Sequence, residues 1–408
     1  MGRVKSAGAA LAVLTGLNLL NYIDRFVPAA VLPSIIADLH LAGGQAGLLQ
    51  TLFIITYSLV SPVAGALGDR NPRFRLAAFG VFIWSLATVG SGLATTFALL
   101  VLARSVIGVG EASYVVVTPS LLSDLYPPER RSRALAIFYA AIPVGTALAY
   151  VLGGGIEAAL GWRWAFFIVG GPGMLLAVAL LFLREPIRGV FDPPGAGAKA
   201  VVRDWAAQLR QRSSFIYNTA AQTIYTFTIG GLAGWMPTYF VQERHLVLKD
   251  ADYRFGLILI LAGFSGTLAG GRLGDWLASR SRSGYFTLSG VGLVAALPFT
   301  LLAVLSPTPA VFWPALFVTL FLLFLNTGPL NAAMANVLPP TLRGRGFALC
   351  TMSIHLLGDA ASPFLIGKSS EYVGLKMPVL ITGMLLPIAG IVLLMGRRAL
   401  ARDLEAVG

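Results

Sequence analysis

The chain consists of long apolar runs separated by short polar ones. An apolar helix of about 20 residues crosses the hydrocarbon core of a bilayer. Residues 283–342 contain no Asp, Glu, Lys or Arg, and we divide them at the proline-rich turn 306–309 because one span cannot be that long. The pattern predicts an all-α membrane protein with twelve transmembrane helices, at 7–35, 44–69, 74–95, 97–124, 133–158, 163–183, 213–241, 254–278, 284–305, 309–336, 345–368 and 376–396.

The N-terminal run resembles a secretory signal only at its start. Arg3 and Lys5 precede it, but Asn18, Asn21 and Asp24 follow where a signal would have a small-residue cleavage site. We therefore interpret it as a retained first helix.

Composition excludes several classes of protein. Hydrophobic residues make up 56% of the 408 residues and charged residues only 12%, which rules out a soluble enzyme. The net charge of +12 does not indicate a nucleic-acid-binding protein, because the basic residues lie in short clusters between spans. Cys350 is the single cysteine and is expected to be a buried apolar residue.

We expect no cofactor and no metal ion. The three histidines are scattered, and neither a nucleophile elbow, a zinc-protease motif nor a phosphate-binding Walker motif is present.

The basic clusters predict the orientation of the chain. Alternate loops hold Arg70, Arg73 and Arg75, then Arg130, Arg131 and Arg133, then six residues from Arg184 to Arg212, then Arg280 and Arg282, then Arg343 and Arg345, then Arg397, Arg398 and Arg402. The other loops hold only Arg163, Arg244, Lys249, Arg254, Lys368 and Lys376. The positive-inside rule therefore places both termini in the cytoplasm.

The two halves of the chain repeat. Gly65-Ala-Leu-Gly-Asp69-Arg70 after the second span matches Gly271-Arg-Leu-Gly-Asp275-Trp after the eighth, and the segment 127–133 matches 339–345. Two pseudo-symmetric six-helix bundles are typical of transporters that rock around a central site. We predict an N-terminal bundle at 1–184, a cytoplasmic linker at 185–212 that contains Asp192-Pro-Pro-Gly195, and a C-terminal bundle at 213–408.

The repeated loops predict a set of gating residues. An aspartate at a helix end can bind arginines of the next turn in one conformation and release them in another. A plain positive-inside turn is the alternative interpretation. The first copy resembles the signature loop of the major facilitator superfamily, and the predicted gating residues are Gly65, Asp69, Arg70, Arg131, Arg133, Gly271, Asp275, Arg343 and Arg345.

Charged residues within spans carry the strongest functional signal, because each is costly in hydrocarbon without a partner or a cavity. Asp24 and Arg25 lie in the first span, and Arg104 lies in the fourth at a comparable depth. Glu111 lies seven residues after Arg104, so both occupy one helix face.

We predict that Asp24 and Glu111 bind protons and that Arg25 and Arg104 hold either a carboxylate or an anionic ligand. Burial disfavours an ionised carboxyl group and a nearby arginine favours it, so an arginine that changes partner couples protons to substrate. Two alternatives are a static salt bridge between the first and fourth spans and an Arg25 that extends to the membrane surface.

His355 and Asp359 lie four residues apart on one face of the eleventh span. Such a pair either relays protons or only forms a hydrogen bond between its two side chains. Other polar residues at mid-membrane depth either line a cavity or join helices by hydrogen bonds. They are Asn18, Asn21, Tyr22, Asn218, Gln222, Tyr225, Thr228, Asn326 and Asn331.

Several segments resemble the spinster branch of the major facilitator superfamily, namely 21–25, 108–114, 131–134, 138–145 and 355–359. The resemblance implies export of lipids with a charged head and one tail, in some members with protons. It also implies that Asp24, Arg25, Arg104 and Glu111 form the coupling and head-group site. The residues predicted to bind substrate are Arg25, Arg104, Asn21, Tyr22, Tyr114, Asn218, Tyr225, His355 and Asp359.

We therefore predict a monomeric, proton-coupled transporter of an amphipathic anion, such as a lysolipid or a sphingosine-phosphate-like molecule. Its compact loops resemble those of bacterial members, which places it in the inner membrane. The first alternative is a permease for hexuronates or other organic anions, whose relatives share the Asn-Tyr-x-Asp-Arg pattern. The second is a receptor or lipid-binding module that moves no solute.

Overall fold

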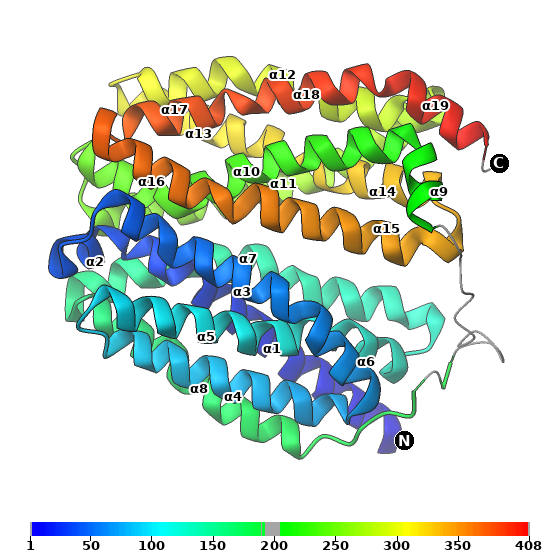
Figure 1. Cartoon of the computed structure of the whole chain (residues 1–408), viewed down its shortest axis with the longest axis horizontal. Helices are drawn as coiled ribbons and strands as arrows, with labels where there is room; N and C mark the ends of the chain where they lie inside the picture. Colours follow the sequence, from blue (N-terminus) through cyan, green and yellow to red (C-terminus); the bar gives the residue numbers. More distant parts are fainter. Residues whose placement is uncertain (1, 189, 192–204, 407–408) are drawn as a thin grey trace. The chain divides into compact units, whose positions relative to one another are not determined.

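The computed structural model describes residues 2–188, 190–191 and 205–406, and this part of the chain is helical without any β-strand (Figure 1). Contacts divide the chain into two compact units. Unit 1 comprises Met1–Lys199 and Phe240–Leu257, and unit 2 comprises Ala200–Tyr239 and Ile258–Gly408. Most of the predicted linker 185–212, including Asp192-Pro-Pro-Gly195, lies outside the described residues.

Each predicted span corresponds to one helix or to a short series of helices. The N-terminal part contains α1 Gly2–Ala30, α2 Leu32–Leu39, α3 Gly43–Arg70, α4 Arg73–Gly92, α5 Phe97–Val115, α6 Thr118–Leu125, α7 Pro128–Leu160 and α8 Trp162–Leu181. The remainder contains α9 Trp205–Gln211, α10 Ser213–Gln242, α11 Leu248–Arg280, α12 Gly284–Leu305, α13 Pro309–Phe324, α14 Thr327–Val337, α15 Pro340–Ser353, the π-helical turn η1 Ile354–Asp359, α16 Ala361–Val373, α17 Lys376–Gly383, α18 Leu385–Met395 and α19 Arg397–Glu405.

Eleven helical segments of the described chain are long and apolar enough to cross a membrane. The seventh predicted span is α10, a helix of 30 residues that carries more polar side chains. The prediction of an all-α membrane protein is therefore confirmed, and the twelve-helix count is consistent with these helices.

Some spans are broken into two helices, and proline marks two of the breaks. The second helix of the first span has Pro33 in its first turn, and α6 has Pro119 in the same position. Proline is tolerated there because the first N–H groups of a helix have no partner within the helix.

In unit 1, glycines let α5 pack closely against two neighbours (Figure 1). A Cβ atom on Gly108 would lie 2.7 Å from the carbonyl oxygen of Phe53 on α3. One on Gly110 would lie 2.5 Å from the carbonyl oxygen of Gly80 on α4. Since no side chain fits at either contact, the two glycines let α5 approach α3 and α4 closely next to Glu111.

Unit 2 is held by similar contacts. Helices α12 and α18 cross at Gly290 and Gly390, where a Cβ on Gly390 would lie 2.6 Å from the carbonyl oxygen of Gly290. Gly230 on α10 packs against Asp359 of η1. As expected, Cys350 is buried.

Candidate substrate and proton site

Among the described residues of α1 and α5 in unit 1, three charged side chains are buried. Asp24 is 2% exposed, whereas Arg104 and Glu111 are fully buried. Charges at such positions are stable only when other groups compensate for the lost water. We call Asp24, Arg25, Arg104 and Glu111 the charged cluster of unit 1. The contacts of these four side chains indicate what the cluster can bind.

Glu111 is paired with Arg25 of α1. Its Oε2 atom accepts a hydrogen bond of 2.7 Å from Nη2 of Arg25 and one of 3.3 Å from Nε. Its Oε1 atom is buried and has no hydrogen-bond partner. The side chain of Arg25 is 13% exposed, so it does not extend to the membrane surface. The ion pair joins the first and fourth spans, as in the salt-bridge alternative.

Arg104 has unused hydrogen-bonding capacity. Its Nη2 atom donates to Oε1 of Gln50 at 3.0 Å, while Nε and Nη1 are buried without a partner. Asp24 and Glu111 lie near enough to interact with it electrostatically, but neither is within the 4.0 Å of an ion pair. Buried guanidinium N–H groups without a partner are costly, so the site favours an anion beside Arg104.

One aromatic ring lies close to both arginines. The guanidinium carbon of Arg104 lies 4.5 Å from the ring centre of Phe53, and that of Arg25 lies 5.3 Å from the same ring. Arg25 also lies over Tyr22 at 5.2 Å and Tyr57 at 4.9 Å. The rings stabilise the cations and provide apolar surface beside the charged groups.

Asp24 has a partner on α4. Its Oδ2 atom lies 2.5 Å from the hydroxyl oxygen of Thr88, while Oδ1 is buried without a partner. The amide oxygen and nitrogen of Asn21 are likewise buried and without a hydrogen bond. The cluster thus holds both donors and acceptors that no described protein group satisfies.

Tyr114 occupies a packing position. It is fully buried, its hydroxyl donates to the carbonyl oxygen of Leu14 at 2.5 Å, and its ring meets Trp84 edge to face. These contacts hold α5 against α1 and α4.

The other predicted substrate residues lie in unit 2. Nδ1 of His355 lies 3.0 Å from Oδ2 of Asp359 within η1, and both side chains are partly exposed. Asn218 donates to the carbonyl oxygen of Leu330, so it joins α10 to α14. Tyr225 is half-buried on α10. A π-helical turn inside an α-helix often marks a functional site.

Two of the predicted gating residues make equivalent contacts in the two halves. Arg131 donates to the carbonyl oxygen of Ser123 at 2.9 Å, eight residues earlier in the last turn of α6. Arg343 donates to the carbonyl oxygen of Ala335 at 2.9 Å, also eight residues earlier and in the last turn of α14. Arginines that bind the carbonyl end of a helix complement its dipole.

These contacts predict matched effects of substitution. Arg131→Ala and Arg343→Ala should each lower the melting temperature by about 2–4 °C, because each removes a charge-assisted hydrogen bond from a helix end. Fluorescence-monitored thermal unfolding in detergent measures this. Arg133→Ala is the control, since Arg133 is exposed. Equal melting temperatures for all three variants and the wild type would contradict the assignment.

The other predicted gating residues on α3, α11 and α15 make different contacts. The backbone carbonyl groups of Gly68 and Asp69 accept hydrogen bonds from Arg188, which follows α8. Asp275 accepts a hydrogen bond of 3.0 Å from Tyr285, the second residue of α12. Four others occupy nearby positions: Gly65 beside Val116, Arg70 exposed at the end of α3, Gly271 beside Gly328, and Arg345 over the ring of Trp205.

Arg73 is the centre of a charge network that the sequence did not identify. It is 5% exposed, its Nη1 atom lies 2.6 Å from Oδ2 of Asp124, and its Nε atom lies 3.0 Å from Oε1 of Glu185. The network ties α4 to the end of α6 and to the segment after α8. The only signal in the sequence was the position of these acids beside basic loops.

A buried acid outside the charged cluster was also missed. Asp252 is fully buried, and neither carboxylate oxygen has a hydrogen-bond partner. It lies beside Gly154 of α7 and close to Glu157, which accepts a hydrogen bond of 2.7 Å from Ser34. An ionised carboxylate without a partner and near a second acid opposes folding.

We therefore expect Asp252→Asn to preserve or raise the melting temperature, because it removes a buried carboxyl group while keeping its shape. Thermal unfolding at neutral pH measures the effect, and Asp38→Asn, at an exposed ion pair with Arg163, is the control. A fall of more than about 5 °C for Asp252→Asn alone would show that the carboxyl group has a stabilising partner.

The described residues contain no group of three or more His, Cys, Asp or Glu side chains that could hold a metal ion. The charged cluster of unit 1 combines two acids with two arginines, which suits binding of protons and anions.

Comparisons with known proteins define the class. Residues 14–363 match the family model of the Major Facilitator Superfamily. Together with the helical fold, this match makes the protein a membrane transporter of that superfamily. The chain is also 36% identical over 384 residues to Protein spinster homolog 1 of Bos taurus, covering 88% of this chain and 72% of the relative, and equally identical over the same shares to the Homo sapiens protein. The chain therefore belongs to the spinster branch, and the predicted family is confirmed.

Solved structures agree on the fold. A bacterial homologue of the human lysosomal transporter spinster, in an inward-facing and unoccupied conformation, matches with a TM-score of 0.88 at 23% identity, covering 98% of each chain. A D-xylose–proton symporter matches with a TM-score of 0.73 at 17% identity, covering 94% of this chain and 96% of the other.

Proposed function

We propose that this spinster-branch transporter moves an amphipathic anion together with protons by alternating access. The carrying observation is the buried cluster in which Arg104 has two unpartnered nitrogen atoms close to Asp24 and Glu111. A buried cation with free donors favours a negatively charged head group, and two adjacent acids provide places for a proton. The substrate class is a lysolipid or a sphingosine-phosphate-like molecule.

The geometry around Thr88 supports a proton on Asp24. The hydroxyl oxygen of Thr88 lies 2.5 Å from Oδ2 of Asp24 and 2.9 Å from the carbonyl oxygen of Trp84. A hydroxyl group has one hydrogen to donate. Both contacts are full two-centre hydrogen bonds when Thr88 donates to Trp84 and a protonated Asp24 donates to Thr88.

Glu111 is the group that we expect to change its charge when substrate binds. Its hydrogen bonds from Arg25 favour the ionised form. An anionic head group that binds Arg25 and Arg104 competes for those donors and leaves Glu111 buried without a cation. Glu111 then takes up a proton, so the proton and the anion bind together.

The aromatic rings favour an amphipathic substrate over the alternative, a hexuronate or another small organic anion. Phe53, Tyr22 and Tyr57 surround the guanidinium group of Arg25. A sugar acid has hydroxyl groups on most of its carbons, and burial of each without a partner is unfavourable. Apolar rings next to two cations instead match a charged head attached to a hydrocarbon tail.

We place the protein as a monomer in the inner membrane of a bacterial cell, with both termini in the cytoplasm. The bundles at 1–184 and 213–408 would move relative to each other around the substrate, with 185–212 as the linker. His355, Asp359, Asn218 and Tyr225 are the proposed contributions of the C-terminal bundle.

A flux assay in liposomes tests the proposal. Purified protein is reconstituted, and uptake of a labelled lysophospholipid and of a labelled hexuronate is measured with and without a pH gradient. We expect uptake of the lysophospholipid only, increased by the gradient. Faster hexuronate uptake would favour the permease, and no uptake of either would favour a receptor or binding module.

A further inference from the structure

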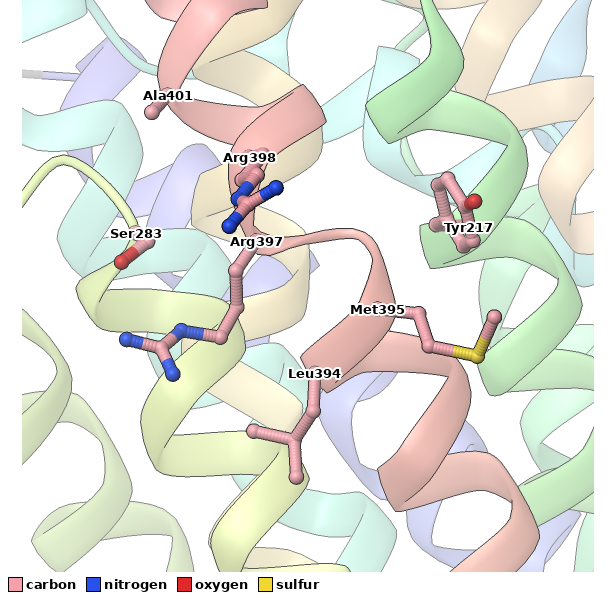
Figure 2. A pocket seen from close by; sticks show the side chains of 7 residues that line it. All are labelled: Tyr217, Ser283, Leu394, Met395, Arg397, Arg398 and Ala401. Atoms are coloured by element: carbon pink, nitrogen blue, oxygen red, sulfur yellow. The ribbon is translucent and has the colours of Figure 1, made fainter.

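An open cavity of about 640 Å³ lies in unit 2, and none of its lining residues belongs to the charged cluster. It is surrounded by the start of α12, the end of α18 and the first turn of α19, with Tyr217 of α10 on one side (Figure 2). These helix ends lie at the predicted cytoplasmic side of the membrane. We call this cavity the α18–α19 pocket.

The polar side of the α18–α19 pocket carries two free positive charges. Arg397 and Arg398 are exposed, and within the described chain neither forms an ion pair with a carboxylate. Neighbouring arginines are different: Arg282 pairs with Glu405 at 2.5 Å, and Arg402 lies 3.6 Å from Asp403. The pocket therefore concentrates charge that its surroundings do not neutralise.

Other donors face the same space. Ser283 contributes a hydroxyl group to the wall (Figure 2). The cavity also includes the N-terminus of α19, which begins at Arg397 after Gly396 and has no side-chain cap. The free N–H groups at a helix N-terminus attract anions. Arginine side chains bind phosphate groups through bidentate hydrogen bonds.

The other side of the α18–α19 pocket is apolar and continues along a membrane-facing helix. Leu394 and Met395 line the pocket. Met395 is also the end of an exposed row on α18 that includes Ile388 and Ile391, at the spacing of one helix face. A ligand with an acidic head and a hydrocarbon chain matches this arrangement, because the chain can follow the row while the head meets the arginines.

The backbone around the α18–α19 pocket is fixed by packing. A Cβ on Gly396 would lie 2.8 Å from Tyr217 and 3.1 Å from the ring of Phe286. Asp403 further along α19 accepts hydrogen bonds from the backbone N–H and hydroxyl groups of Ser214. The two arginines are thus presented by a helix that is anchored to α10 and α12.

We propose that the α18–α19 pocket binds the phosphate head group of an anionic phospholipid from the cytoplasmic leaflet. Basic pockets between transmembrane helices at this level are suited to such head groups. A bound lipid would bridge α10, α12 and α19 and stabilise unit 2. This site is independent of the transported substrate and of the charged cluster in unit 1.

Native mass spectrometry of the purified full-length protein tests the proposal, with phosphatidylglycerol and phosphatidylcholine offered in equal amounts. We expect the wild type to retain phosphatidylglycerol preferentially. Arg397→Gln combined with Arg398→Gln should weaken phosphatidylglycerol binding by roughly 10- to 30-fold, from the loss of two interfacial charges. Equal retention of the two lipids by the wild type would overturn the proposal without reference to any variant.

The matched control is Arg282→Gln combined with Arg402→Gln. It removes the same charge at the same end of unit 2, from arginines that already have acidic neighbours. We expect it to keep the preference for phosphatidylglycerol. An equal loss of phosphatidylglycerol binding in both double variants would show that the effect depends only on net charge, and it would contradict the proposed site. Inorganic phosphate and glycerol phosphate should not displace the lipid, whereas displacement by either would identify a site for a free anion.

Discussion

Replacement of Glu111 by glutamine is expected to abolish the response of transport to a pH gradient while the protein stays folded. Glutamine keeps the volume of the side chain and an oxygen that can accept from Arg25, but it cannot take up a proton. Asp24 remains nearby, and loss of its proton would restore a negative charge beside the arginines. In liposomes, the ratio of uptake with a gradient to uptake without one should fall to about one.

The control for this experiment is Asp38→Asn. Asp38 is also an acid in an ion pair with an arginine, but its side chain is 44% exposed, and exposed pairs contribute little to stability. We expect it to transport like the wild type at every pH. A gradient response that persists in Glu111→Gln would remove Glu111 from the coupling mechanism, and a comparable loss in Asp38→Asn would make the effect unspecific.

Substitution of Arg104 is expected to have the second largest effect, on substrate affinity. Arg104→Gln removes a buried cation whose Nε and Nη1 atoms have no hydrogen-bond acceptor. A hydrogen bond to a charged group contributes about 1.5–3 kcal/mol, so the affinity for the anionic substrate should fall about 10- to 100-fold. Binding of a lysophospholipid to the purified protein, followed by tryptophan fluorescence, measures the change.

Arg104→Lys distinguishes charge from geometry in the same measurement. Lysine keeps the charge but lacks the planar fork of guanidinium, so we expect an intermediate affinity. Arg163→Gln is the control, because Arg163 is partly exposed and pairs with Asp38 at a distant helix end. Wild-type affinity in Arg104→Gln would contradict a role in head-group binding.

The helices were largely predictable from the sequence because a span requires a long apolar run, and such runs are visible without any structure. The breaks within spans had a weaker signal. Pro33 and Pro119 stand in the first turns of α2 and α6, and both positions could have been recognised as helix starts. Hydropathy alone joined these helices to their predecessors.

The charged residues of the site were predictable as a set, whereas their partners were not. Burying a charge in a membrane span is costly, so the four charged residues within the first and fourth spans stand out in the sequence: Asp24, Arg25, Arg104 and Glu111. That Arg25 rather than Arg104 binds Glu111 depends on how α1 packs against α5, which no periodicity in the sequence describes.

Apart from Asn21 and Tyr22, the uncharged members of the site gave no usable signal. Gln50, Phe53 and Thr88 contact the charged groups. Residues of the same types, at similar spacings, also occur at many positions that only pack helices together. Glycines are a partial exception, because Gly108 and Gly110, two residues apart and so on opposite faces of α5, indicate that this helix approaches its neighbours closely near Glu111.

In the proposed mechanism, an anionic head group displaces Glu111 from its ion pair with Arg25, and Glu111 then binds a proton. Isothermal titration calorimetry of a lysophospholipid into the purified protein, in buffers with different enthalpies of ionisation, counts that proton directly. We predict uptake of up to about one proton per ligand bound by the wild type and none by Glu111→Gln. Binding heats that are the same in every buffer for the wild type would contradict the exchange of partners.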